Sequence, residues 1–229
     1  MKTIGLIGGM SWESTQTYYR LVNQKVREQL GGLHSAKIVL YSVDFSEIEA
    51  LQHKGDWDGT AKILISAAQS IEAGGADLLL ICTNTMHKIA PQIEQATTMP
   101  LLHIAEATAK VLIRDGITSV GLLGTRFTME QAFYRERLEK QGIKVITPEG
   151  GERDAVHRII YEELCQGIIN PDSKGRYLDI VDSLAARGAQ AVILGCTEIG
   201  LLLQSSDTQV ALYDTTEIHA AQAVELALR

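Results

Sequence analysis

The sequence predicts an α/β protein of two pseudo-symmetric parallel-sheet domains that arose by internal duplication, with the active site in the cleft between them. The segment Ile-Gly-Leu-Ile-Gly at residues 4–8 recurs as Val-Gly-Leu-Leu-Gly at residues 120–124. A Gly-Ala pair followed by an apolar run likewise occurs at residues 75–82 and again at residues 188–195. In addition, strand-like apolar runs alternate with helix-length amphipathic segments, which is typical of βαβ units and of a parallel sheet covered on both faces.

The expected elements follow this alternation along the chain. In the first half we expect strands at 3–7, 37–42 and 77–82, and helices at about 13–29, 60–73 and 86–95. In the second half we expect strands at 101–104, 119–123, 144–146 and 191–194, and helices at about 105–115, 128–141, 153–166 and 174–187. A strand at 209–213 and a helix at about 217–228 have no counterpart at the end of the first half.

Pro100 marks the boundary between the halves, because the residue before a proline is biased out of helix. We therefore expect a first domain at residues 1–99, completed by the C-terminal segment 208–229, and a second domain at residues 100–207. No low-complexity linker separates the halves, so we expect the domains to share an interface with limited hinge freedom.

Composition bounds the class of protein. The 229 residues are 45% hydrophobic, enough for an ordinary globular core. A net charge of −7 without clustered Lys and Arg disfavours nucleic acid as the main partner. No run of 18 apolar residues occurs, and the first three residues lead into a strand without a signal-like segment, so we expect a soluble cytoplasmic protein with no membrane partner.

The three cysteines, Cys82, Cys165 and Cys196, form neither an even disulfide set nor a Cys-x-x-Cys pair, which is typical of a reducing compartment. Cysteine and histidine show no metal-ligand spacing, so we expect no structural or catalytic metal. Strand alternation points Cys82 away from the face of its neighbour, and Cys165 lies at a helix end, so both are expected to be structural.

Nucleophilic and polar side chains follow the third strand of each half. Thr83, Asn84 and Thr85 end one apolar run, Cys196 and Thr197 end its copy, and the repeat places Thr83 opposite Cys196. Ligands of open α/β sheets lie outside the carboxyl ends of the strands, so both segments are expected at a binding site. A thiol at a helix N-terminus has a lowered pKa, which makes Cys196 a candidate general base; the alternative is a small buried side chain.

The glycine-rich turn at residues 5–11 lacks the G-x-G-x-x-G spacing of dinucleotide-binding turns, and no G-x-x-x-x-G-K-[ST] motif is present, so a nucleotide-dependent enzyme is disfavoured. The turn either permits close approach of a ligand or only connects strand and helix tightly. Its copy at residues 124–128 offers hydroxyls and a helix N-terminus that could hold a carboxylate. His87 could orient the loop that contains it. The cations nearest these loops are Lys88, Arg126, Lys54 and Arg20.

Five motifs together resemble the aspartate/glutamate racemase family, in order and at the family's spacing across the whole chain. They are Gly-Gly-Met-Ser-Trp-Glu-Ser-Thr at 8–15, Ser-Val-Asp-Phe at 42–45, Thr-Asn-Thr-Met-His at 83–87, Leu-Leu-Gly-Thr-Arg-Phe-Thr at 122–128 and Gly-Cys-Thr-Glu at 195–198. The opening Gly-Gly-Met resembles the aspartate racemase branch. The resemblance implies a small-molecule amino-acid substrate, two-base proton transfer at Cα without any cofactor, such as pyridoxal phosphate, and commonly a homodimer.

The resemblance also implies roles for individual residues. It places the second catalytic thiol on Cys196 and substrate contacts of backbone and hydroxyl on Thr197. Asn84 and Thr85 match positions whose amide and hydroxyl hold the α-carboxylate and ammonium of the substrate. The remaining substrate-binding positions match Met10, Gln52 and Thr125.

The first catalytic position departs from the family pattern, because the usual cysteine is Thr83 here. A hydroxyl is a far weaker acid than a thiol and scarcely ionises near neutral pH, so Thr83 is a poor base. We therefore expect a racemase for aspartate and glutamate with asymmetric forward rates. In it, Cys196 abstracts the α-proton from one enantiomer, and Thr83, or water that it positions, delivers a proton to the opposite face.

Three alternatives remain open from the sequence. A racemase for neutral amino acids such as homoserine would use the same two-base chemistry. An arylmalonate-decarboxylase-like enzyme keeps only the second cysteine, as this chain does. A catalytically silent amino-acid-binding protein is the third, since the loss of one base can leave a binding site without turnover.

Overall fold

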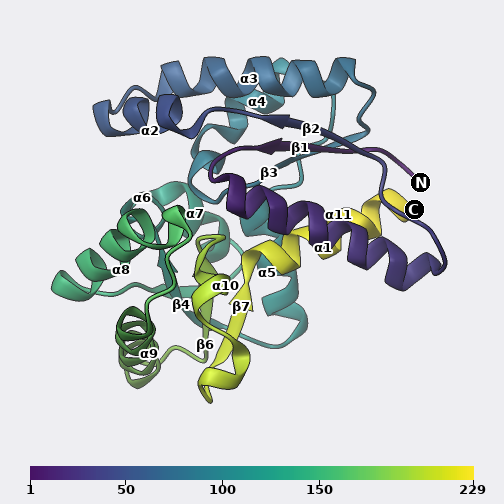
Figure 1. The fold of residues 1–229 in the computed structure, drawn as a ribbon. Coiled ribbons are helices and arrows are strands. Elements are labelled where there is room, and N and C mark those ends of the chain that lie inside the picture. Colours follow the sequence, from purple (N-terminus) through teal and green to yellow (C-terminus); the bar gives the residue numbers. More distant parts are fainter. The chain divides into compact units, whose positions relative to one another are not determined.

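A computed structural model describes residues 1–229 as an α/β chain with two parallel sheets (Figure 1). The chain divides into two compact units. The first comprises Met1–Ile104 and His219–Arg229, and the second comprises Ala105–Ile218. The predicted fold class is therefore confirmed, and each unit is built around its own sheet.

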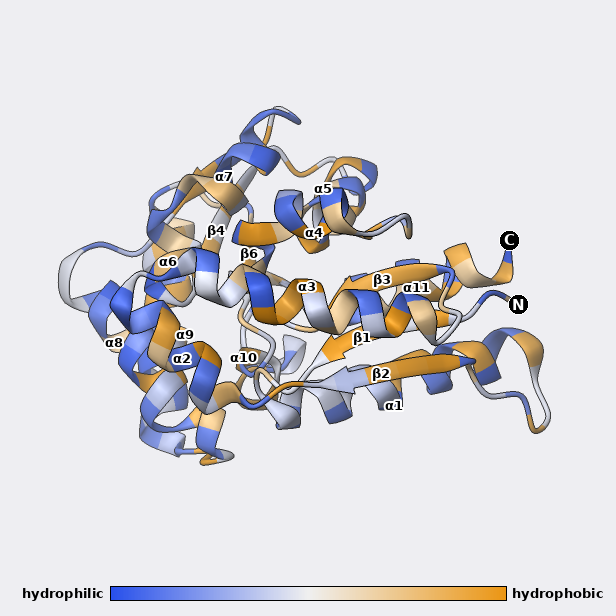
Figure 2. Ribbon diagram, turned by 90° about the horizontal axis from the view of Figure 1, so that it is seen from above, coloured by the Kyte–Doolittle hydropathy of each residue, from blue (hydrophilic) through white to orange (hydrophobic).

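The first unit contains a three-stranded parallel sheet in the order β2-β1-β3, with α3 and α4 on one face and α1 on the other (Figure 1). Its strands are β1 (Ile4–Gly8), β2 (Ile38–Ser42) and β3 (Leu78–Ile81). Its helices are α1 (Trp12–Leu30), α2 (Phe45–Lys54), α3 (Trp57–Ala73), the 3₁₀ helix η1 (Thr85–Ile89) and α4 (Ala90–Ala96). Strands β1 and β3 are wholly buried and apolar, whereas α3 alternates apolar and polar residues (Figure 2).

The second unit contains a four-stranded parallel sheet in the order β5-β4-β6-β7. Its strands are β4 (Ser119–Gly124), β5 (Lys144–Ile146), β6 (Ala191–Gly195) and β7 (Ala211–Asp214). Its helices are α5 (Ile104–Arg114), α6 (Arg126–Glu130), α7 (Ala132–Glu139), α8 (Gly150–Glu162), η2 (Leu164–Gln166), α9 (Pro171–Ala186), α10 (Ile199–Leu202) and η3 (Ser205–Asp207). The last helix, α11 (Thr215–Leu228), begins in this unit and ends in the first.

The duplication is visible in the order of the strands. The sheet order β2-β1-β3 of the first unit recurs as β5-β4-β6 in the second, and every pairing is parallel. Strand β3 leads into Thr83 and strand β6 leads into Cys196, so the two residues occupy equivalent strand ends in their own sheets.

The domain boundaries differ from the predicted ones at both points where the chain passes from one unit to the other. Leu101 forms a parallel bridge with Leu79 of β3, so the chain leaves the first unit after Ile104 rather than at Pro100. The strand expected at residues 209–213 pairs with β6 in the second sheet, so the return to the first unit occurs at His219 and not at residue 208. Backbone pairing, which composition does not reveal, decides both positions.

Some helices also differ from the expected ones, and the helix expected at residues 86–95 is divided into η1 and α4. Helix α2 was not expected, although Asp44 caps its N-terminus and Gly55, in the left-handed conformation, ends it. The helix expected at residues 128–141 is divided into α6 and α7 by Gln131, whose backbone is extended.

Candidate active site

The turn between β1 and α1 is held by backbone geometry that only glycine permits at one position. Gly9 has φ of +94°, and a Cβ there would lie 2.1 Å from the carbonyl oxygen of Val43. The Gly9 N–H donates to Thr15 Oγ1 at 2.8 Å, and Thr15 in turn donates to the Ser11 carbonyl at 2.8 Å. This close packing orients Met10, whose side chain is only 3% exposed and packs in the apolar core of the first unit.

The segment after β3 is held by hydrogen bonds from α1 and from η1. Ser14 of α1 donates a hydrogen bond to the Cys82 carbonyl at 3.0 Å. Cys82 itself is fully buried, and burial raises the pKa of its thiol, as expected for a core residue. Thr83 follows as a half-buried side chain, and the neighbouring Asn84 and Thr85 are buried.

His87 fixes this loop through a defined tautomer. Its Nδ1 lies 2.8 Å from the Thr83 carbonyl oxygen, and its Nε2 lies 3.2 Å from the backbone N–H of Ile104. A carbonyl only accepts and a backbone N–H only donates, so the imidazole is neutral with its proton on Nδ1. His87 is therefore a positioning residue for the backbone of Thr83, as its place in the sequence suggested.

Gln52 joins this group from α2. It is 4% exposed, and its Nε2 donates to the sulfur of Met86 at 3.0 Å. The first unit therefore brings Gln52, Met86 and the Asn84-Thr85 segment together at the carboxyl end of its sheet.

The second unit brings Thr125 and Cys196 to adjacent strand ends. Gly124 of β4 pairs with Gly195 of β6, and a Cβ on Gly195 would lie 2.6 Å from the Leu123 carbonyl oxygen. Because neither glycine has a side chain, the two strands can pair closely up to their ends. Thr125 and Cys196, which follow the two glycines, therefore lie at adjacent strand ends. Thr125 caps the N-terminus of α6, where its Oγ1 accepts from a backbone N–H, and it is 6% exposed.

Cys196 is linked to a carboxylate that the sequence did not single out. The Cys196 thiol donates to Glu198 Oε2 at 3.0 Å, and the Thr197 hydroxyl donates to the same oxygen at 2.7 Å. All three side chains are buried. The hydroxyl holds the carboxylate in place, so the carboxylate is a ready acceptor for the thiol proton.

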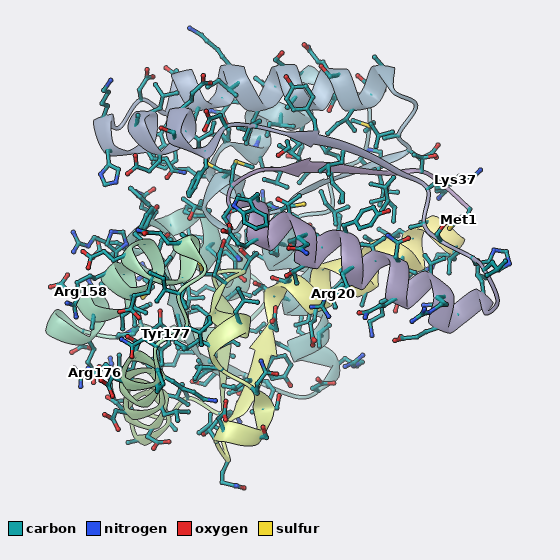
Figure 3. The ribbon with its side chains drawn as sticks, viewed as in Figure 1. Met1, Arg20, Lys37, Arg158, Arg176 and Tyr177 are labelled. Carbon is teal, nitrogen blue, oxygen red and sulfur yellow. The ribbon has the colours of Figure 1, made fainter.

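The prediction that the pKa of Cys196 is lowered is wrong. Burial raises the pKa of this thiol well above its ordinary value of 9.0, and the negative charge of Glu198 raises it further. Helix α10 has only four residues, and it begins three residues after the cysteine, so its dipole cannot offset these effects. The thiol also shares the core cluster of the second unit with Tyr177, which α9 contributes (Figure 3).

The four candidate cations occupy different surroundings. Arg126 is engaged by Asp154 at 2.6 Å, and Arg20 lies on α1 (Figure 3). Lys54 is an exposed residue at the end of α2. Lys88 lies over the ring of Trp57, with 3.7 Å between Nζ and the ring centroid.

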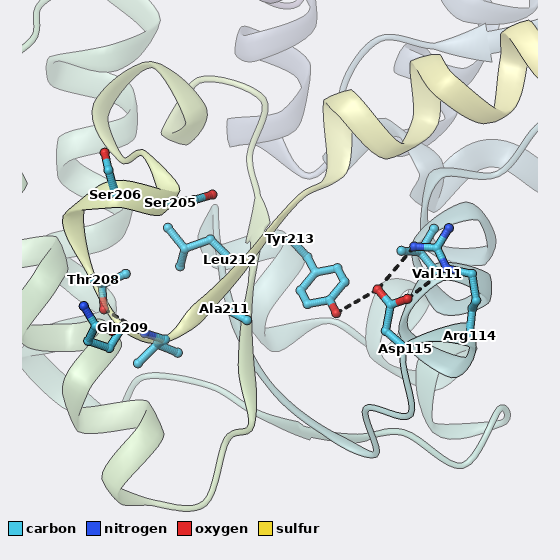
Figure 4. A pocket seen from close by; sticks show the side chains of 11 residues that line it. Val111, Arg114, Asp115, Ser205, Ser206, Thr208, Gln209, Ala211, Leu212 and Tyr213 are labelled. Carbon is cyan, nitrogen blue, oxygen red and sulfur yellow. Dashed lines mark hydrogen bonds and ion pairs between the residues drawn. The ribbon is translucent and has the colours of Figure 1, made fainter.

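Two cavities lie away from the predicted catalytic and substrate-binding residues. One of about 630 Å³ is lined by residues 205, 206 and 208–213 and by the end of α5, where Tyr213 donates to Asp115 at 3.0 Å and Arg114 pairs with the same carboxylate (Figure 4). The other, of about 590 Å³, lies between α1, where Arg20 lines it, and residues 32–35.

No three His, Cys, Asp or Glu residues are grouped as metal ligands. None of the helices combines the length and apolarity that a membrane span requires.

Comparison with known proteins gives one consistent result. The chain is 59% identical to a Yersinia pestis protein assigned to the Asp/Glu racemases, with a TM-score of 0.93 over 100% of both chains. It is 35% identical to an aspartate racemase homologue from Pyrococcus horikoshii OT3, with a TM-score of 0.87 over 100% of both chains. It is 25% identical to the broad specificity amino-acid racemase RacX of Bacillus subtilis (strain 168), over 98% of each chain. The model of the Asp/Glu/hydantoin racemase family matches residues 7–223, and this chain belongs to that family.

Proposed function

We propose that the chain is a cofactor-independent racemase that interconverts the enantiomers of aspartate and glutamate by two-base proton transfer at Cα. Cys196 serves one face of the substrate carbon and Thr83 serves the other. Asn84 and Thr85 hold the α-carboxylate and ammonium, and Met10, Gln52, Thr125 and Thr197 complete the binding residues.

The contact between Cys196 and Glu198 carries this proposal. A thiol with a raised pKa is a poor base by itself, but the carboxylate 3.0 Å away can accept its proton when substrate binds. The resulting thiolate takes the α-proton of the substrate, and the thiol forms again. Glu198 then returns its proton to solvent.

Thr83 completes the reaction on the opposite face. Its hydroxyl, or water that it positions, gives a proton to the carbanion and is reprotonated by solvent. In the reverse direction the hydroxyl has to act as a base, for which its acidity is too low. The forward rates are therefore unequal, although the ratio of the two specificity constants still obeys an equilibrium constant of one in achiral solvent.

The buried hydrogen bonds of Cys196 and Glu198 favour this proposal over the silent amino-acid-binding protein, because a binding site alone has no use for a carboxylate on a buried thiol. A neutral amino-acid substrate and a decarboxylase of substituted malonates are the remaining alternatives. The first gives exchange with homoserine but not with aspartate, and the second releases carbon dioxide from a malonate.

The test is incubation of the purified protein in D₂O, without added cofactor, with each enantiomer of aspartate and glutamate. NMR follows loss of the α-proton and chiral chromatography follows inversion. We expect deuterium incorporation with inversion, faster from one enantiomer, and we expect Thr83→Cys to raise exchange from the slower one. Absence of exchange with all four amino acids contradicts the proposal.

A further inference from the structure

The 3₁₀ helix η1 presents its three faces to different surroundings. Side chains three residues apart are eclipsed in a 3₁₀ helix. Met86 and Ile89 share one face, and both are buried in the apolar core of the first unit. His87 lies on a second face and makes the two hydrogen bonds described above. Thr85 and Lys88 therefore share the third face.

Lys88 is the one side chain of η1 that is not buried. Its ammonium rests on the ring of Trp57 at the start of α3, and none of the ion pairs of the structure includes it. Asp56, which precedes Trp57 in the chain, is the N-cap of α3, where its side chain accepts a hydrogen bond from the Gly59 N–H at 2.8 Å. Partial burial lowers the pKa of Lys88, and no charged neighbour compensates.

A half-buried ammonium with only an aromatic ring beneath it is held in place but not neutralised. The ring stabilises the ammonium more than an apolar side chain would. It leaves the ammonium N–H groups that point away from the ring available as hydrogen-bond donors. An anion at this position gains a charge-assisted contact without first breaking an existing ion pair. The surroundings of Lys88 are thus suited to a carboxylate that arrives with a ligand.

Residues proposed to bind substrate lie in the same short helix as Lys88 or contact that helix. Thr85 is one 3₁₀ turn away on the same face, a rise of about 6 Å along the helix axis. Gln52 contacts Met86 in the same helix. A flexible lysine side chain spans such a rise, so the α-carboxylate and side-chain carboxylate of one small amino acid can reach Thr85 and Lys88 together.

We infer that Lys88 binds the side-chain carboxylate of the substrate and sets the preference for acidic over neutral amino acids. The inference rests on the racemase function proposed above and specifies the substrate class of that same site. Trp57 acts as a positioning residue that keeps the lysine side chain on the face of Thr85. Arg126 is not suited to this role because Asp154 already holds its charge.

The experiment compares aspartate with asparagine, its neutral isostere, as substrates for α-proton exchange. In Lys88→Met, which removes the charge but keeps an apolar chain, the ratio of kcat/KM for aspartate to that for asparagine falls about tenfold or more, through KM for aspartate. Lys88→Arg restores most of the ratio. The matched control is Lys62→Met, an exposed lysine of α3 in the same unit, which leaves the ratio at the wild-type value.

A second readout does not depend on turnover. The chain has two tryptophans, so in a Trp12→Phe background the emission of Trp57 reports the environment of Lys88. Titration with aspartate changes this emission, and the dissociation constant for aspartate rises about tenfold or more in Lys88→Met. An unchanged preference in Lys88→Met, in exchange or in binding, overturns the inference, as does wild-type protein that binds aspartate no better than asparagine. Binding with this preference but no exchange contradicts only the racemase proposal.

Discussion

Just after β6, one carboxylate oxygen accepts two hydrogen bonds from neighbouring residues in the chain. Glu198 accepts from both the Cys196 thiol and the Thr197 hydroxyl, and burial keeps the thiol protonated at rest. The sequence predicts Cys196 as a candidate site residue because the duplication places it opposite Thr83. It could not give the direction of the pKa shift, since nothing in the order of residues 196–198 shows that the glutamate side chain folds back onto the thiol.

Glu198→Gln tests the role of this carboxylate. The amide occupies the same space but is a far weaker proton acceptor, so we expect kcat to fall about a hundredfold with little change in KM. The pKa of Cys196 should fall at the same time, because the negative charge that raises it is gone. Alkylation of the thiol followed against pH measures the second effect.

Glu198→Gln should raise the rate at which the Cys196 thiol is alkylated and lower kcat. A thiol that alkylates more readily in an enzyme that turns over more slowly is the expected combination. Glu225→Gln, an exposed residue of α11, serves as the control for loss of one carboxylate. Wild-type kcat in Glu198→Gln would show that the carboxylate takes no part in proton transfer.

Among the elements, the turn between β1 and α1 depends most strongly on one residue. Its glycines are evident from the sequence, but the sequence left open whether they admit a ligand or only make a tight turn. In the structure, Gly9 is required by the approach of the β2–α2 loop, because the Val43 backbone occupies the position that a Cβ would take. The turn is thus a close backbone packing at the carboxyl end of the sheet.

Gly9→Ala should lower the free energy of unfolding by roughly 3 kcal/mol. The added Cβ collides with the Val43 backbone, and the alanine has to adopt a positive φ. Gly55→Ala separates these causes. Gly55 also has a positive φ, of +71°, but a Cβ there would have no atom within 4 Å, so this variant should lose only about 1 kcal/mol. Urea denaturation measures both, and equal losses would argue against the collision.

Short and polar elements were the hardest to predict. Helix α2 was missed because Phe45–Lys54 has few apolar residues, although a capping aspartate and a terminal glycine flank it. The segment at residues 86–95 was expected to be one helix, but it begins as the 3₁₀ helix η1. That difference matters, because the 3₁₀ geometry places the Lys88 side chain directly in line with that of Thr85, whereas an α-helix would offset the two side chains around its axis.

For the whole molecule, the alternation of strands and helices and the internal repeat were sufficient to predict two similar α/β units. They did not determine where the chain passes from the second unit back to the first, because this point lies within α11, which starts in one unit and ends in the other. Two titrating groups lie at this point of the chain: Asp214 ends β7 directly before α11, and His219 lies within α11. Burial raises the pKa of Asp214 to about 6 and lowers the pKa of His219 to about 4.

The two groups give opposite pH dependences of stability. His219 binds a proton more weakly in the folded chain, so its contribution is present above its ordinary pKa of 6.5 and is lost as the pH falls through about 4. Asp214 binds a proton more tightly in the folded chain, so its contribution is present below its ordinary pKa of 3.8 and is lost as the pH rises through about 6.

Asp214→Asn isolates the second contribution. The amide oxygen can still accept from the backbone N–H groups of Thr216 and Glu217, which Asp214 caps at 2.7 and 3.2 Å. We expect the variant to be more stable than wild type by roughly 1–2 kcal/mol at pH 7, with the difference vanishing toward pH 4. Thermal unfolding at several pH values measures this, and a constant difference across that range would be inconsistent with a raised pKa.

The role of Cys196 is the central claim, and loss of the α-proton in D₂O tests it most directly. Wild-type protein and the Cys165→Ala variant, which loses a different thiol of the same unit, should both exchange the α-proton of aspartate. Cys196→Ala should exchange it from neither enantiomer, while the fold is retained as judged by circular dichroism. Exchange that survives in Cys196→Ala would contradict the assignment of this thiol as the base.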